Sequence, residues 1–97
     1  MKHFLLTYTL AADYLERRPA YRVEHLTLAK EAVARGELVL GGPLDPPEEA
    51  MLLFAGEDAS TAEAFARADP YVINGIVSEW RVREWTTVVG AGAMSPV

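Results

Sequence analysis

The order in which strand-like and helix-like segments follow one another constrains the fold of this chain more than any other feature. Alternating apolar side chains predict a strand over residues 2–10. A helical pattern that begins at Pro19 runs to Arg35, where Gly36 supplies a stop. The remaining segments predict strands at 37–40 and 51–55, a helix at 60–69 and a strand at 77–89. The order βαββαβ favours an α+β, ferredoxin-like sandwich, in which a four-stranded antiparallel sheet carries two helices on one face.

The connections carry signals of their own. The run Gly41-Gly42-Pro43 is expected to close the second strand, and two prolines within residues 45–49 predict a surface loop. Ser60 and Glu63 have the spacing of a capping box at the start of the second helix. Asp69 precedes a proline and is expected to end that helix, with residues 71–75 forming a loop.

The third strand-like segment is apolar at every position from Met51 to Ala55. Leu5 and Val39 are expected to add apolar groups on the sheet face away from the helices. A continuous apolar run is typical of a strand that is buried on both sides. A second copy of the chain is the simplest cover for the open face, so we expect a homodimer.

Composition excludes several classes of protein. A chain of 97 residues has room for one domain, which we place at residues 1–90 with a tail at 91–97. Nine basic and fourteen acidic residues leave a net charge of −5, and the basic residues are scattered except for Arg17-Arg18 and Arg81-Arg83, so nucleic acid is not an expected partner. Cysteine is absent, and no apolar run is long enough for a signal peptide or a membrane span. We expect a cytoplasmic protein with no membrane partner.

Two titratable residues, His25 and Asp69, lie on otherwise apolar helix faces. Apolar residues lie within about 100° of His25 on a helical wheel, namely Tyr21, Leu26, Leu28, Ala29, Ala32 and Val33. Ala62, Phe65 and Ala66 form a face that the helical spacing continues to Asp69. The two helices of such a sandwich run antiparallel, so the two side chains are expected to meet. A carboxylate that accepts a hydrogen bond from one imidazole nitrogen raises the basicity of the other, which suits acid–base catalysis.

Less specific interpretations of this pair stay open. A lone histidine on an apolar face is usually a core residue, and an aspartate before proline is usually a helix terminator. A metal site has little support, because His3 is the only other histidine and is expected on the opposite sheet face. Nucleophilic catalysis has little support either, since cysteine is absent and no serine lies in a nucleophile elbow.

Four further residues are candidates for substrate binding. Arg22 lies one turn before His25 and could anchor an anionic substrate or pack against the helix. Gly42 and Pro43 could bring backbone close to a ligand or could only end a strand. Tyr71, like Trp85, could form a pocket wall or could belong to the core or an interface.

Several motifs, taken in order, resemble those of the YCII-related family. They are Arg22-Val-Glu-His25-Leu26, Gly42-Pro43-Leu44, Asp69-Pro70-Tyr71 with Gly75 following, and Trp85. The resemblance implies a ferredoxin-like fold that pairs into a dimeric α+β barrel, in the superfamily that includes muconolactone isomerases. It also implies that His25 and Asp69 form an active site, without assigning a reaction.

The leading hypothesis is a small cofactor-independent enzyme in which Asp69 orients His25. The histidine would move protons on a small cyclic carbonyl or enol compound, in an elimination or an isomerisation. The competing hypothesis is a non-catalytic module in which the same pocket holds a small ligand, or in which the pair is only structural.

Overall fold

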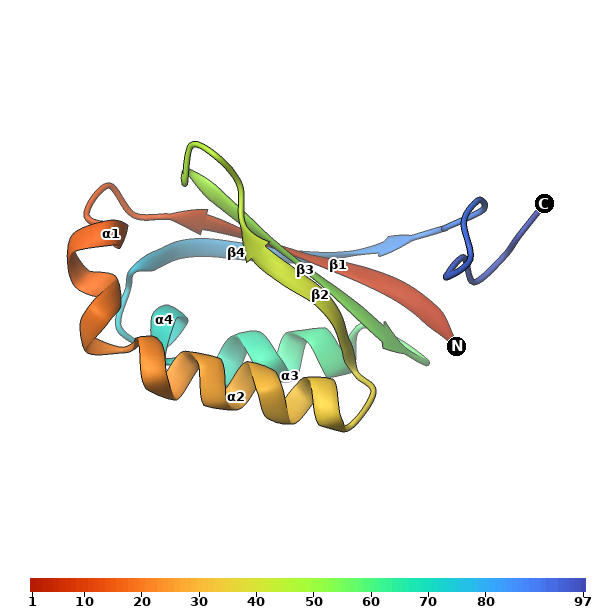
Figure 1. Cartoon of the computed structure of the whole chain (residues 1–97), viewed down its shortest axis with the longest axis horizontal. Helices are drawn as coiled ribbons and strands as arrows, with labels where there is room; N and C mark the ends of the chain where they lie inside the picture. The colour runs from red at the N-terminus through yellow and green to blue at the C-terminus, as the bar shows by residue number, and fades with distance from the viewer.

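The computed structural model describes all 97 residues and confirms the βαββαβ order (Figure 1). Three short helical segments accompany the two long helices and four strands. The elements are β1 (Lys2–Leu10), α1 (Tyr14–Arg17), the 3₁₀ helix η1 (Arg18–Ala20), α2 (Arg22–Ala34), β2 (Leu38–Pro43), β3 (Glu49–Gly56), α3 (Ser60–Ala68), α4 (Pro70–Ile73) and β4 (Val77–Trp85). None of the helices combines the length and the apolar character that a membrane crossing requires.

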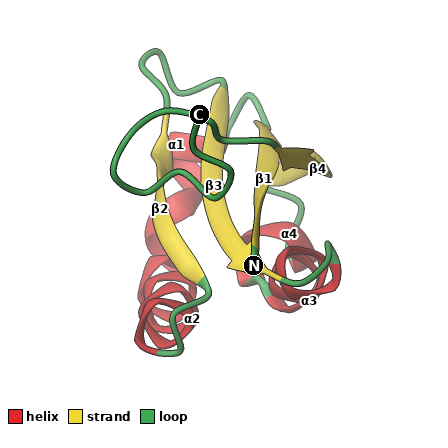
Figure 2. Cartoon of the chain, turned by 90° about the vertical axis from the view of Figure 1, so that its right-hand side faces the viewer, coloured by secondary structure: helices red, strands yellow, loops and turns green.

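The four strands form one antiparallel sheet in the order β2-β3-β1-β4. Both long helices lie on the same face of this sheet (Figure 2). In the end-on view, α2 lies below the β2 edge and α3 lies below β1. The other face carries no helix. The fold is therefore the predicted α+β, ferredoxin-like sandwich.

The core lies between the sheet and the helices and follows the alternation seen in the sequence. The even positions of β1 from Phe4 onward are buried, namely Phe4, Leu6, Tyr8 and Leu10. Leu52 and Phe54 extend this apolar layer on β3. On α3, Ala62, Phe65 and Ala66 face the layer, and the rings of Phe54 and Phe65 lie 5.3 Å apart. The period-2 pattern thus predicted correctly which face of β1 is buried.

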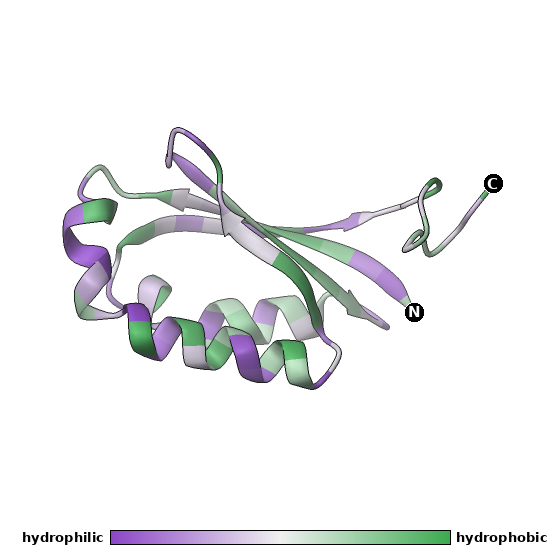
Figure 3. Ribbon diagram, viewed as in Figure 1, coloured by the Kyte–Doolittle hydropathy of each residue, from purple (hydrophilic) through white to green (hydrophobic).

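The two long helices pack unequally against the sheet. α3 buries three residues within nine, whereas α2 buries only Ala32 within thirteen. Hydrophilic and hydrophobic residues alternate closely around α2, while β3 is apolar along most of its length (Figure 3). Val33 was expected within the apolar arc but is 54% exposed. The loose seating of α2 leaves space between this helix and β2.

Residues 71–75 do not form the loop that the sequence suggested. Pro70 to Ile73 form α4, one short turn of helix. Asp69 has an extended backbone, with φ −71° and ψ 122°, and its side chain accepts a hydrogen bond from the backbone N–H of Tyr71. Asp69 therefore ends α3 and also caps α4, because proline is well suited to the first position of a helix whose preceding residue is a capping aspartate.

The starts of both long helices also differ from expectation. Pro19 does not begin the first helix but lies in η1, and the long helix starts at Arg22. The predicted capping box does not form, because Ser60 is itself the first residue of α3. The N–H of Ser60 instead donates to Asp58 Oδ1 at 2.9 Å, and hydrogen bonds from Ser60 lower the pKa of Asp58.

The second and fourth strands end at other positions than predicted. The run Gly41-Gly42-Pro43 continues β2, and Pro43 pairs with Ala50. Proline is tolerated there because β2 is an edge strand. β4 stops at Trp85 rather than at residue 89. Residues 95–97 fold back instead, with the N–H groups of Ser95 and Val97 donating to the carbonyls of Thr87 and Val88.

The open face of the sheet is only partly apolar. Met51 and Leu53 on β3 and Leu5 on β1 point to this face and are half-buried. Val39 lies at a register shift between Leu38 and Leu40, so it has no directly paired residue on β3, and it is among the residues that line the cavity. Leu5, Met51 and Leu53 are among the residues that the sequence predicts a second copy of the chain to cover.

Candidate active site

His25 and Asp69 meet, as their helix positions predict. His25 lies in the first turns of α2, and Asp69 lies at the corner between α3 and α4. The His25 Nδ1 atom is 2.8 Å from Asp69 Oδ1. The Asp69 side chain is fully buried, whereas that of His25 is 15% exposed. A buried acidic group and a nearly buried base are therefore in direct hydrogen-bond contact.

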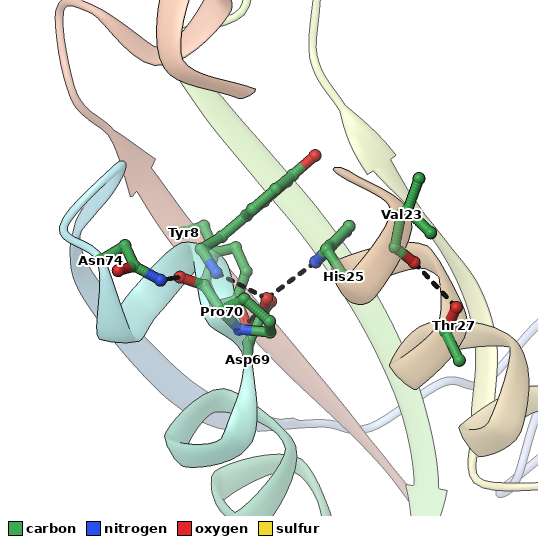
Figure 4. Close-up of polar contacts among 8 residues, drawn as sticks. Tyr8, Val23, His25, Thr27, Asp69, Pro70 and Asn74 are labelled. Atoms are coloured by element: carbon green, nitrogen blue, oxygen red, sulfur yellow. Dashed lines mark hydrogen bonds and ion pairs between the residues drawn. The ribbon is translucent and has the colours of Figure 1, made fainter. Parts of the chain in front are cut away.

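Three donors surround the Asp69 carboxyl group. His25 Nδ1 and the N–H of Tyr71 contact Oδ1, the latter at 2.9 Å. The Tyr8 hydroxyl donates to Oδ2 at 2.7 Å. Figure 4 shows Tyr8 and His25 directed toward Asp69 from β1 and α2. A carboxylate has only acceptor sites, so this contact places the ring proton of neutral His25 on Nδ1 and leaves Nε2 as the free basic atom.

Aromatic rings fix the plane of the His25 imidazole. The Tyr71 ring stacks on it, with centroids 3.8 Å apart and an interplanar angle of 6°. Phe65 approaches it edge-on at 6.5 Å. Tyr14 packs edge-on against Tyr71 in turn, at 6.0 Å. Burial raises the pKa of Tyr71 to about 12, so its phenol is neutral in the physiological range.

A cavity of about 450 Å³ lies between α2 and the β2–β3 edge of the sheet. His25, Tyr8 and Tyr71 line it, and most of its other lining residues are hydrophobic. This volume is within the usual range for small-molecule sites, roughly 300–1,000 Å³. The histidine that Asp69 holds thus borders a space that fits a small ring compound.

The structure places all four predicted substrate-binding residues on this cavity. Arg22 lies on α2, Gly42 and Pro43 lie on β2, and Tyr71 lies on α4. Trp85 does not line the cavity and is 50% exposed at the end of β4.

Sequence reasoning did not identify three residues of the site, namely Tyr8, Arg18 and Lys30. The alternation in β1 predicts only a core position for Tyr8, although a buried phenol needs a hydrogen-bond partner and is for that reason a candidate site residue. Arg18 precedes the segment over which the helical spacing predicts a helix. The same spacing puts Lys30 on the polar side of that helix, but α2 stands far enough from the sheet for its flank to border the cavity.

Arg18 has an unusual environment. Its Nε atom is buried and is the one buried side-chain nitrogen or oxygen in the chain without a hydrogen-bond partner. The guanidinium carbon lies 5.5 Å from the centre of the Tyr14 ring, which holds the group in place by a cation–π contact. Leaving such a donor unpaired costs about 1–3 kcal/mol.

His3 lies apart from this site. It is on the other face of β1, where its Nδ1 is 2.7 Å from Thr87 Oγ1. No group of three or more histidine, cysteine, aspartate and glutamate side chains gathers in a way that could hold a metal ion.

Comparison with known proteins gives a family and a fold. The family model of the YCII-related domain matches residues 1–86. No curated protein matches the sequence. Among solved structures, the chain is similar to the 5-chloro-2-hydroxyhydroquinone dehydrochlorinase TftG from Burkholderia phenoliruptrix AC1100, in complex with 2,5-dihydroxybenzoquinone. Identity is 20%, the TM-score is 0.73, and the match covers 88% of this chain and 94% of TftG.

Two other similar structures are NIPSNAP proteins without an assigned function. A family member from Agrobacterium tumefaciens has a TM-score of 0.61 at 19% identity, with 97% of this chain and 94% of that chain covered. An uncharacterised domain from Burkholderia xenovorans has a TM-score of 0.57 at 19% identity, with 96% and 98% covered. At these identities the structural matches establish the shared fold.

Replacing Tyr8 tests the hydrogen bonds around Asp69. We expect Tyr8→Phe to lower the free energy of unfolding by about 1–3 kcal/mol, because Asp69 Oδ2 would remain buried without its donor. Tyr21→Phe is the control, since the Tyr21 hydroxyl makes no hydrogen bond and its loss should change stability by less than about 0.5 kcal/mol. Urea unfolding at pH 7 measures both, and equal effects would contradict the assignment.

The same variant has a predicted pH signature. Burial, and then Asp69, raise the pKa of Tyr8 above its ordinary value. Because the pKa of Tyr8 is higher in the folded than in the unfolded chain, its contribution to stability is fully present below about pH 10. That contribution is lost as the pH rises further. Wild-type protein should therefore lose more stability between pH 10 and 11 than Tyr8→Phe does, as urea unfolding at the two pH values would show.

Proposed function

Since the chain belongs to the family of YCII-related domains, we propose that it is a small enzyme in which His25, held by Asp69, moves protons on a small cyclic carbonyl or enol compound. The observation that carries the proposal is the 2.8 Å contact between His25 Nδ1 and Asp69 Oδ1 at the wall of the cavity. Family membership supports the fold that positions these two residues. The proposed chemistry rests on the contact between them.

The proposed reaction begins with His25 Nε2 as a general base. It takes a proton from a carbon next to a carbonyl group, and the electron pair of the C–H bond passes to the carbonyl oxygen as an enolate. The Asp69 carboxylate stabilises the imidazolium that forms. The proton then returns to another carbon, which completes an isomerisation, or the enolate expels a leaving group, which completes an elimination. Such catalysis is worth typically about 10²–10⁴-fold, which suits an already acidic C–H bond.

The similarity to TftG supports the proposed substrate class. TftG is a dehydrochlorinase of 5-chloro-2-hydroxyhydroquinone, and its structure holds 2,5-dihydroxybenzoquinone. Both compounds are single rings with hydroxyl or carbonyl oxygens, and the cavity of about 450 Å³ has room for one such ring. We therefore include hydroxylated quinones and hydroquinones among the compounds to be tested, with elimination as the leading reaction type.

Replacing His25 tests the proposal. Turnover would be followed as chloride release from chlorinated hydroxyhydroquinone and as solvent deuterium uptake into a panel of cyclic enols and enones. His25→Gln should lower the rate by about 10²–10⁴-fold for any compound that the wild type turns over. Thr27→Ala is the matched control, because Thr27 lies on the exposed side of α2 and its hydroxyl donates a hydrogen bond only to the carbonyl of Val23. Retention of full activity in His25→Gln would contradict the proposal.

A non-catalytic binding module is the second candidate function. It is favoured by the structural role of Asp69, which caps α4 and accepts from Tyr8 as well as from His25. Asp69→Asn separates the two functions. The enzyme proposal expects a fall in turnover, corrected for the folded fraction, of at least about 10²-fold. Loss of stability without loss of turnover or of ligand binding would make the pair structural.

The proposal on assembly is a homodimer formed through the open face of the sheet. Leu5, Met51 and Leu53 lie half-buried on this face, and a second copy would cover them. We expect sedimentation velocity at micromolar concentration to show a particle of twice 10.6 kDa. Leu53→Lys should shift it to the monomer, whereas Val23→Lys, at an exposed position of α2, should not. A wild-type monomer would contradict the proposal.

A further inference from the structure

Three cationic side chains line the cavity beside His25. Arg18 comes from η1, and Arg22 and Lys30 come from α2. None of the three forms an ion pair, although the chain has fourteen acidic residues and nine basic ones. No aspartate or glutamate is among the residues that line the cavity. The cavity wall is therefore positive in a chain whose net charge is −5.

Arg18 is the most specific of these three groups. Its Nε atom is buried without an acceptor, while its guanidinium is held over Tyr14. Arg18 is only partly exposed and lines the cavity, and charge-assisted hydrogen bonds from such a guanidinium to an anion are the strong ones. Arg22 and Lys30 are exposed and add attraction at longer range. One partly buried cation and two exposed cations therefore line the same cavity.

We infer that the cavity binds its ligand as a small planar anion, with Arg18 as the anchoring residue. This inference rests on the proposed function for the identity of the site, and it adds the charge state of the substrate class. An enolate, a phenolate or a carboxylate attached to a ring would be such an anion. Donors already in place around a developing enolate oxygen would also stabilise the charge that forms when His25 removes a proton.

Matched pairs of ligands test the charge preference. One pair is 1,3-cyclohexanedione, an enolate at pH 8, and its neutral ether 3-methoxycyclohex-2-en-1-one. The other pair is benzoate and benzamide. Titration calorimetry on the wild type should give at least about tenfold tighter binding for the anion of one pair or both, as expected for hydrogen bonds to a charged group. Equal binding within both pairs would overturn the inference.

Variants assign the preference to Arg18. Arg18→Gln should weaken binding of the anion about tenfold and leave the neutral partner unchanged. Arg67→Gln is the control, because it removes the same charge at a residue outside the cavity. Arg67 lies on α3, over the ring of Trp80. Equal weakening by both variants would overturn the assignment. If Arg18→Gln does not fold, Lys30→Gln at an exposed position must still reduce the preference, and an unchanged preference in it would overturn the inference.

The binding experiment also separates this inference from the proposed function. It is repeated in His25→Gln, which removes both turnover and any imidazolium charge. If His25→Gln still prefers the anion and the wild type turns over none of the compounds, the result supports the anion site and contradicts the proposed enzyme activity. Turnover by the wild type with equal binding of anion and neutral ligand overturns the anion site alone.

Discussion

A buried carboxylate requires donors, and the requirement of Asp69 organises this molecule. Tyr8, His25 and the N–H of Tyr71 all contact its two oxygens, from positions 61, 44 and 2 residues away in the sequence. These donors join the first strand, the first long helix and the corner between α3 and α4. Burial of an unpaired charge is strongly unfavourable, so the fold and the orientation of His25 depend on one another. The same three hydrogen bonds hold the helices in place and set the ring tautomer.

The two long helices serve different purposes. α3 seals its part of the sheet with Ala62, Phe65 and Ala66. α2 buries only Ala32 and stands away from β2, which is what leaves a cavity of about 450 Å³. A closer fit of α2 would add stability by burying more apolar surface but would fill the space beside His25. The arrangement gives up packing along one helix for a site that a small molecule can enter.

Much of this arrangement could be predicted from periodicity. The order of strand-like and helix-like segments predicts the fold. The antiparallel helices of that fold, with His25 and Asp69 on their apolar faces, predict the contact between the two residues. The capping role of Asp69 was missed, because an aspartate before proline fits both the end of one helix and the start of another. Arg18 could not be identified, since its position depends on how η1 turns against Tyr14, a tertiary contact that has no sequence period. Tyr8 was placed correctly in the core, but its hydroxyl partner lies 61 residues away.

The central claim is that Asp69 holds the imidazole with Nδ1 protonated and Nε2 free beside the cavity. Nitrogen-15 NMR of the His25 ring in its neutral form tests this directly, because the two ring nitrogens have different shifts when protonated and when bare. The account predicts a proton on Nδ1 in the wild type and a loss of this preference in Asp69→Asn. A wild-type ring protonated on Nε2, or a tautomer unchanged by Asp69→Asn, would contradict it.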